Sequence, residues 1–209
     1  MRMERMMTAA LVLVGTMSLA LVSGCEVDSK KTGNGDDVKI ATPFGGLSVK
    51  TDGAGVMQAI GLPAYPGAEL VKKKEKDSGS ADINMSFGRF QLKVKAASYR
   101  TPDSPEMVKV FYLKGLSKYG TVIQCLNNKP VGTPTQTPEG LTCDNERENH
   151  ISVSDDVSGK VELKAGSKQH QHIVGIDPEG KGTKFGLVAL DLPGHISFGD
   201  GKGNDDDKQ

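Results

Sequence analysis

Hydrophobic and polar residues alternate along much of the chain, a pattern typical of β-strands that bury one face. The longest example is residues 83–97, INMSFGRFQLKVKAA, in which two alternating segments flank Gly88-Arg89, a pair suited to a tight turn. A similar pair of segments, 38–40 and 47–50, flanks PFGG. Further along the chain, shorter strand-like segments follow: TVIQCL, HISVS, KVELKA, HQHIVGI and KFGLVAL. The pattern predicts an antiparallel sheet built from hairpins.

One segment has helical spacing instead. Ser104 suits the N-cap, Pro105 the first helical position, and Gly120 a left-handed stop after the last turn. Between them, apolar residues recur at helical intervals and form one stripe: Met107, Val108, Phe111, Tyr112 and Leu116. We therefore predict one main helix at about residues 104–118.

Together these elements predict an α+β fold. We expect an antiparallel β-sheet of about six to eight strands, with the helix at 104–118 packed on one face, in a single domain over residues 38–198. Residues 62–126, which include YPGAELVKK and SPEMVKVFYLKGL, resemble a short domain of uncharacterised exported bacterial proteins. The resemblance rests on a turn, a helix cap and a helix face, so it implies no chemistry.

The chain begins with the features of an export signal. Two arginines in MRMERMM precede the uncharged segment TAALVLVGTMSLALVSG, which is too short to span a bilayer comfortably. The stretch LVSGC at residues 21–25 resembles the lipobox of bacterial lipoproteins, with leucine first and small residues before the cysteine. The resemblance implies that residues 1–24 are a signal peptide that is removed and that Cys25 carries diacylglycerol. The alternative is an ordinary signal peptide followed by a chance cysteine.

Lipidation determines where we expect the protein. Acyl chains on Cys25 predict stable attachment to a membrane of the bacterial cell envelope. Glu26 stands where lipoproteins retained at the inner membrane of enteric bacteria tend to have aspartate, which favours the outer membrane. Residues 25–37 are polar and contain glycine, so we expect a flexible tether; residues 199–209 lack apolar side chains and predict a disordered acidic tail.

Composition narrows the classes of partner. Without residues 1–24 the chain has 24 Lys+Arg and 25 Asp+Glu, a formal charge of −1, which gives no electrostatic basis for binding nucleic acid. Tryptophan is absent and aromatic residues make up 5% of the chain, so a surface for stacking sugars or bases is not expected. The partners that we expect are the membrane, through the lipid, and an envelope protein or the cell wall.

Two further cysteines, Cys125 and Cys143, follow in the second half of the chain. In an exported protein such a pair usually forms a disulfide, which here closes a loop rich in proline, threonine and glycine. A metal pair or a reactive thiol is the alternative. The sequence does not favour it, because neither cysteine belongs to a C-x-x-C motif or has a histidine close by.

The sequence QHQH contains candidate metal ligands. Side chains alternate along a strand, so His170 and His172 share one side and suit a common metal ion. Val174 and Ile176 lie on that same side, and the alternative is therefore a partly buried strand face without a metal. The other histidines are His150 and His195, and the sequence does not show whether folding places them near His170 and His172.

Motifs for catalysis are few. GIDPEGKGT matches phosphate-loop spacing, but Gly182 replaces the magnesium-binding hydroxyl residue and a strand-like segment follows, so we interpret it as a hairpin turn. The sequence has no G-x-S-x-G or H-E-x-x-H motif, although a Ser-His-Asp site assembled by folding stays open. We predict a non-catalytic interaction or structural module with no cofactor beyond the lipid on Cys25. The alternative is a periplasmic small-ligand or metal-binding module that uses the face of His170 and His172.

Overall fold

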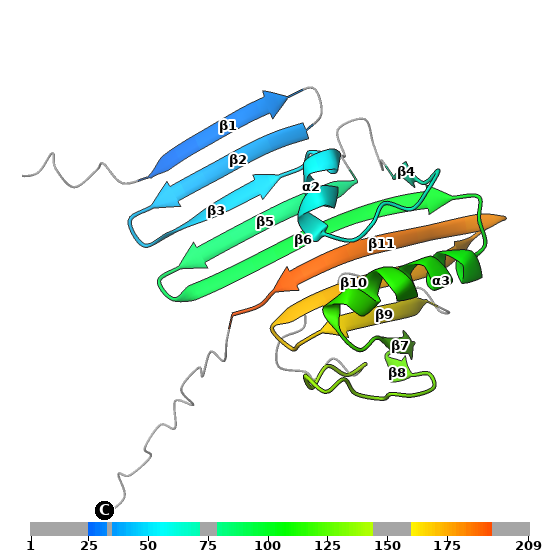
Figure 1. Ribbon diagram of the computed structural model, residues 1–209. Coiled ribbons are helices and arrows are strands. Elements are labelled where there is room, and N and C mark those ends of the chain that lie inside the picture. The colour runs from blue at the N-terminus through cyan, green and yellow to red at the C-terminus, as the bar shows by residue number, and fades with distance from the viewer. Residues whose placement is uncertain (1–24, 33–34, 72–78, 144–159, 194–209) are drawn as a thin grey trace, which may run out of the picture.

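The structure, a computed structural model, describes residues 25–32, 35–71, 79–143 and 160–193 (Figure 1). Strands dominate these residues, with two α-helices and one short 3-10 helix. The elements, in chain order, are β1 (Glu26–Thr32), β2 (Gly35–Thr42), β3 (Gly45–Lys50), α2 (Gly53–Ile60), β4 (Glu69–Leu70), β5 (Ser80–Phe87), β6 (Phe90–Thr101), α3 (Pro105–Leu116), η2 (Ser117–Tyr119), β7 (Ile123–Leu126), β8 (Lys129–Pro130), β9 (Val161–Gly166), β10 (His170–Glu179) and β11 (Gly182–Asp191).

All the strands belong to one antiparallel sheet of eleven strands (Figure 1). Its order is β1-β2-β3-β5-β6-β11-β10-β9-β7-β8, and β4 pairs with the far end of β6. The predicted α+β fold, with six to eight strands and one main helix on a face, is therefore wrong. In the part of the chain that the structure describes, the protein is mostly β with two short α-helices.

The strands that the sequence does not predict show no alternation of hydrophobic and polar residues, for physical reasons. β4 and β8 have two residues each, too few for an alternation to be visible. β1, with the sequence EVDSKKT, is an edge strand, where charged side chains discourage pairing with other chains. It pairs with β2 from Glu26 opposite Ala41 to Thr32 opposite Gly35. The range 25–37, for which the sequence predicts a tether, thus contains β1 and the start of β2. Other predicted features lie outside the described residues: the signal peptide at 1–24, the strand-like segment at 150–154 and the tail at 199–209.

Two hairpin turns are where the sequence predicts them: PFGG contains the turn from β2 to β3, and Gly88-Arg89 connects β5 to β6. A hairpin also forms within GIDPEGKGT, but its turn is Gly180-Lys181, because Asp177, Pro178 and Glu179 still pair with β11 as part of β10. Gly88 and Gly180 have φ angles of 57° and 59°, a left-handed conformation that glycine adopts without steric cost. Local turn chemistry was sufficient to find these hairpins.

The main predicted helix is confirmed as α3, which is followed by η2. Ser104 is its N-cap residue, as predicted, although the Ser104 side chain makes no capping hydrogen bond. Val108, Tyr112 and Leu116, each four residues apart, are fully buried. Met107, which the sequence places on the same apolar stripe, is 56% exposed because it lies to one side of this line.

Helix α2 has no counterpart in the sequence prediction. The Asp52 carboxylate caps it by accepting a hydrogen bond from the N–H of Gly55 at 3.0 Å, and Gly61, with φ 75°, ends it. Val56 and Ile60, one turn apart, are buried. These caps and this spacing are the signal for the helix, which two glycines in its first turn obscure.

Both α-helices lie on the same face of the sheet (Figure 1), where α2 packs on β5, β6 and β11 and α3 packs on β9, β10 and β11. The rings of Tyr65, Tyr112 and Phe185 meet beneath α3 with centroids 5.5 to 6.3 Å apart. The buried residues of this core are Val56, Ile60, Leu62, Tyr65, Ala97, Val108, Tyr112, Leu116, Leu163, Ala165, Val174, Ile176, Phe185 and Leu187.

The other face of the sheet is also apolar. Directly opposed residues of an antiparallel pair share a face and successive residues alternate, so the register assigns each side chain to a side. The apolar residues on the side away from the helices are Val27, Val38, Ile40, Leu47, Val49, Ala81, Ile83, Met85, Phe87, Phe90, Leu92, Val94, Ala96, Ile173, Val188 and Leu190. We call this set the open apolar face, because both described α-helices lie on the opposite side. On the helix side the first strands present polar residues such as Lys39, Ser48 and Asn84.

Candidate functional site

Cys25, the predicted lipidation site, is exposed and is not part of a disulfide. Strand β1 begins at the next residue, Glu26, which already pairs with Ala41 of β2. The Cys25 sulfur is therefore joined to the edge of the sheet without an intervening flexible segment. Its acylation stays a prediction.

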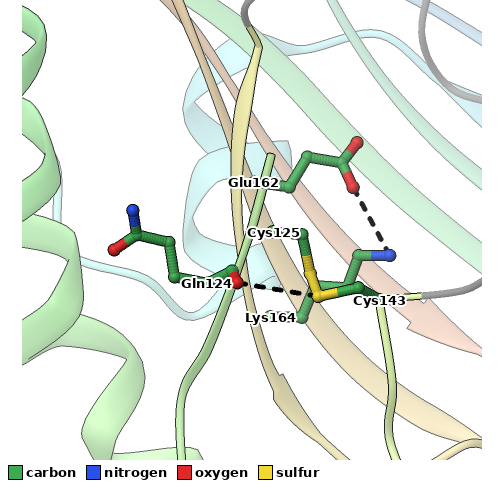
Figure 2. The surroundings of a disulfide bond; sticks show 5 residues. All are labelled: Gln124, Cys125, Cys143, Glu162 and Lys164. Atoms are coloured by element: carbon green, nitrogen blue, oxygen red, sulfur yellow. Dashed lines mark hydrogen bonds and ion pairs between the residues drawn. A yellow bond between two sulfur atoms is a disulfide. The ribbon is translucent and has the colours of Figure 1, made fainter. Parts of the chain in front are cut away.

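The predicted disulfide between Cys125 and Cys143 is confirmed, with Cα atoms 5.5 Å apart (Figure 2). Both cysteines are 1% exposed and form a second apolar cluster with Ile123 and Leu141. The register of β7 places Ile123 and Cys125 on the side of the sheet away from the helices. The disulfide thus fastens the loop that it closes to one end of the open apolar face.

A buried ion pair lies beside the disulfide (Figure 2). Lys164 Nζ is 3.4 Å from Glu162 Oε2, and the Lys164 side chain is 4% exposed. In the β7–β9 pairing Lys164 is opposite Ile123 and Glu162 is opposite Cys125. Because the two sulfur atoms are oxidised and buried, neither acts as a thiolate nucleophile, and the arrangement is structural.

His170 is the exposed member of the predicted metal pair. Its Nδ1 atom lies 2.9 Å from Oδ1 of Asp191, which is directly opposite on β11. This hydrogen bond lowers the pKa of the Asp191 carboxyl below its ordinary value, although partial burial acts in the opposite direction. His170 therefore already has an anionic partner on the next strand.

His172 has different surroundings. Its ring is half-buried and stacks on the ring of Tyr119, with centroids 3.5 Å apart. The Tyr119 hydroxyl donates a hydrogen bond to the carbonyl oxygen of Gly61 at 2.8 Å. Burial lowers the pKa of His172 below its ordinary value, and a hydrogen bond to the backbone of Ile60 partly opposes this shift. His172, a residue of β10, thus packs against η2 and the end of α2.

The structure places the two histidines on the same side of β10, as predicted, but the groups that they contact explain both residues without a metal. No three His, Cys, Asp or Glu side chains of the described ranges gather as a metal site. His150 and His195 lie outside those ranges. Metal binding by His170 and His172 stays a prediction.

A groove that the sequence does not indicate lies beside α3. Its volume is about 620 Å³, within the range of small-molecule sites. Tyr65 is buried there, and its hydroxyl donates a hydrogen bond to Oδ2 of Asp103 at 2.8 Å. Burial raises the pKa of Tyr65 to about 12, and the hydrogen bond to Asp103 acts in the same direction. The residues that line the groove are Tyr65, Pro66, Asp103, Glu106, Met107, Val110 and Phe111.

No protein-family model, curated protein or solved structure matches this chain. Within the described ranges, none of the helices has both the length and the apolar character needed to cross a bilayer. The geometry of the chain itself is therefore the basis for a functional proposal.

Proposed function

We propose that this chain is a lipid-anchored protein of the bacterial cell envelope that acts by binding rather than by catalysis. One observation carries the proposal: Cys25 ends the sequence LVSGC, is exposed, and is followed at once by β1. Acyl chains on the Cys25 sulfur then hold the edge of an eleven-stranded sheet directly at a bilayer. Glu26 after the cysteine favours the outer membrane.

The open apolar face supports the binding role. It extends over seven neighbouring strands, from β1 to β10; most of its side chains are half-buried, Val27 and Phe87 are exposed, and Val188 and Leu190 are buried. Contiguous apolar surfaces are typical of interaction sites. Its side chains are hydrocarbon apart from the thioether of Met85, so they offer no strong hydrogen bonds to a polysaccharide. We therefore favour an envelope protein with a complementary apolar surface over the cell wall as the partner.

Palmitate labelling tests the anchor. In a bacterial host the wild-type protein should incorporate labelled palmitate and fractionate with membranes, whereas Cys25→Ser should do neither. The control is Ser29→Ala on the same exposed edge strand, which should label like the wild type. Absence of label from the processed wild-type protein would refute the proposed anchor.

Site-specific crosslinking tests the face. Leu47 and Ser48 are neighbours on β3 that point to opposite sides of the sheet. A photo-crosslinking amino acid at Leu47 should capture a partner protein in intact cells, and the same group at Ser48 should not. Met85→Lys, directly opposite Leu47, should remove the adduct. Equal capture at both positions would show that contact is not specific to the open apolar face.

The groove beside α3 favours a second candidate function, binding of a small apolar ligand. Its carboxylates are Asp103, which accepts the hydrogen bond from Tyr65, and Glu106, which is ion-paired with Lys109, so a ligand with a positive charge would take the place of the Lys109 ammonium. Apolar amines should then raise the melting temperature of the wild type but not of Met107→Lys, whose new charge lies in the groove. Val27→Lys, a change at an exposed apolar residue of β1, is the control and should respond like the wild type.

A further inference from the structure

Exposed apolar side chains gather at the end of the sheet where Cys25 is located. Phe44 is 82% exposed, Val27 is 65% exposed and Phe87 is 48% exposed. Val27 is two residues from Cys25 on β1, Phe44 lies in the turn between β2 and β3, and Phe87 is the last residue of β5. Several apolar side chains this exposed at one end of a sheet are typical of a surface that contacts a partner.

The register brings these residues to the same end of the sheet. β1 starts at Glu26 opposite Ala41, three residues before Phe44. Across the next pair of strands, Gly45 is directly opposite Phe87. The start of β1, the β2–β3 turn and the β5–β6 turn therefore lie next to one another, at the left end of the sheet in Figure 1.

The two turns are joined to each other. The N–H of Gly88 donates a hydrogen bond to the carbonyl oxygen of Phe44 at 3.3 Å. A Cβ atom on Gly45 would lie 2.7 Å from Cδ1 of Phe87, so the Phe87 ring covers this glycine. We call Phe44, Phe87, Gly88 and Arg89 the sheet tip. It is a defined surface that holds two aromatic rings beside the proposed lipid.

The charge of the two hairpins suits an anionic membrane surface. Residues 38–51 and 83–102 contain lysine and arginine but no aspartate or glutamate. Arg89, at the β5–β6 turn, is exposed. Asp37, Asp52 and Asp82, which flank these ranges, lie at the strand ends away from the two turns, and Glu26 is on β1 next to Cys25. Basic side chains beside inserted aromatic rings are the usual composition of surfaces that bind phospholipid headgroups.

We propose that the sheet tip is a second membrane contact, which inserts Phe44 and Phe87 into the interfacial region of the bilayer beside the acyl chains of Cys25. The inference rests on the proposed lipid anchor and adds an orientation to it. Acyl chains alone leave a protein free to rotate above the bilayer, whereas two rings on adjacent turns fix the strands so that they rise from the membrane. The open apolar face then stands to the side, accessible to an envelope protein.

Tryptophan substitution tests the contact, because the chain contains no tryptophan and each variant therefore has a single fluorophore. Phe44→Trp and Phe87→Trp report on the sheet tip. Val131→Trp, at a position just after β8 that is 43% exposed and outside the groove beside α3, is the matched control. Each processed protein is isolated from cell membranes and placed on vesicles of phosphatidylethanolamine and phosphatidylglycerol with brominated acyl chains. The mass of the amino-terminal peptide from the same preparation reports acylation of Cys25.

The expected result is a blue shift and bromine quenching of both sheet-tip fluorophores, with the Val131→Trp emission unchanged. Quenching in an acylated protein that is no greater for Phe44→Trp and Phe87→Trp than for the control overturns the inference but leaves the anchor intact. If Cys25 is not acylated, the proposed function fails, and the same quenching comparison still decides whether the sheet tip binds lipid by itself.

A second measurement does not depend on fluorescence. Transfer of the acylated protein from donor to acceptor vesicles should be roughly tenfold faster for each phenylalanine of the sheet tip that is replaced by serine, because each ring leaves the bilayer. Val131→Ser should transfer at the wild-type rate. Equal transfer rates for Phe44→Ser, Phe87→Ser and the control contradict insertion of the rings.

Discussion

The ring of His172 lies flat on the ring of Tyr119, with centroids 3.5 Å apart and 13° between the planes. Tyr119 belongs to η2, and its hydroxyl donates to the carbonyl oxygen of Gly61, the C-cap of α2. The stack therefore connects β10 with η2 and α2 on the face of the sheet that the helices cover. A histidine that the sequence offers as a metal ligand has a packing role here.

Acid should destabilise the fold through His172. Burial lowers its pKa in the folded state below the ordinary value of 6.5. Between these two values the unfolded chain binds more protons than the folded chain, so stability falls as the pH drops below 6.5 and is independent of this group above it. His172→Phe keeps a ring for the stack and removes the titration. Its urea midpoint should therefore fall less than that of the wild type between about pH 7.5 and about pH 5.5.

The matched control for this prediction is Tyr119→Phe. It keeps a ring for the stack and keeps His172, and it removes only the hydroxyl that donates to the carbonyl oxygen of Gly61. This variant should keep the pH dependence of the wild type over the same range. A His172→Phe protein that folds cooperatively but loses as much stability in acid as the wild type would show that another group is responsible.

Removing the disulfide should lower the free energy of unfolding without changing the packing of the helices on the sheet. Cys125 and Cys143 are 18 residues apart, and closing a loop of this size restricts the unfolded chain by about 3 kcal/mol in the chain-entropy description. The Cys125→Ala/Cys143→Ala variant should therefore lose about 3 kcal/mol of unfolding free energy in urea. Because both sulfurs are buried, native protein in mild reductant should resist alkylation until it unfolds. An unchanged urea midpoint would contradict this.

Two residues that the sequence places on one apolar stripe of α3 should behave differently. Tyr112 is fully buried against Tyr65 and Phe185, so Tyr112→Ala should lower the free energy of unfolding by about 3–5 kcal/mol. Met107 is 56% exposed, and Met107→Ala should change it by no more than about 0.5 kcal/mol. Urea titration of the two variants checks the difference. Similar losses in both would mean that the stripe is buried as a whole.

The features that sequence reasoning found are those whose causes are local. The β5–β6 hairpin needs a glycine at its turn, α3 needs a start signal and an apolar spacing, and Cys125 and Cys143 are the pair of cysteines that the sequence predicts to be oxidised. β1 could not be found in this way, because a polar edge strand is held by the backbone of its neighbour. The surroundings of His172 were equally hidden, since Tyr119 is 53 residues away in the numbering.

The β9–β10 hairpin gives a test of backbone crowding that the sequence alone does not suggest. Gly166, at the end of β9, has φ 106°, and a Cβ atom there would lie 2.1 Å from the carbonyl oxygen of His170. Gly180, in the β10–β11 turn, has φ 59° with no atom within 4 Å of the same position. Gly180→Ala should therefore cost only the left-handed backbone preference, about 1–2 kcal/mol.

Gly166→Ala should cost more than Gly180→Ala, because the opposing atom belongs to the backbone and cannot rotate away. The turn after Gly166 also sets the start of β10, where the N–H of Ser167 donates to the carbonyl oxygen of His170 at 2.8 Å. Displacing that carbonyl should disturb the turn, so amide hydrogen exchange at Ser167 should accelerate in Gly166→Ala and stay at the wild-type rate in Gly180→Ala. Equal unfolding free energies and equal exchange rates in both variants would show that the hairpin accommodates a Cβ atom at position 166 without a steric clash.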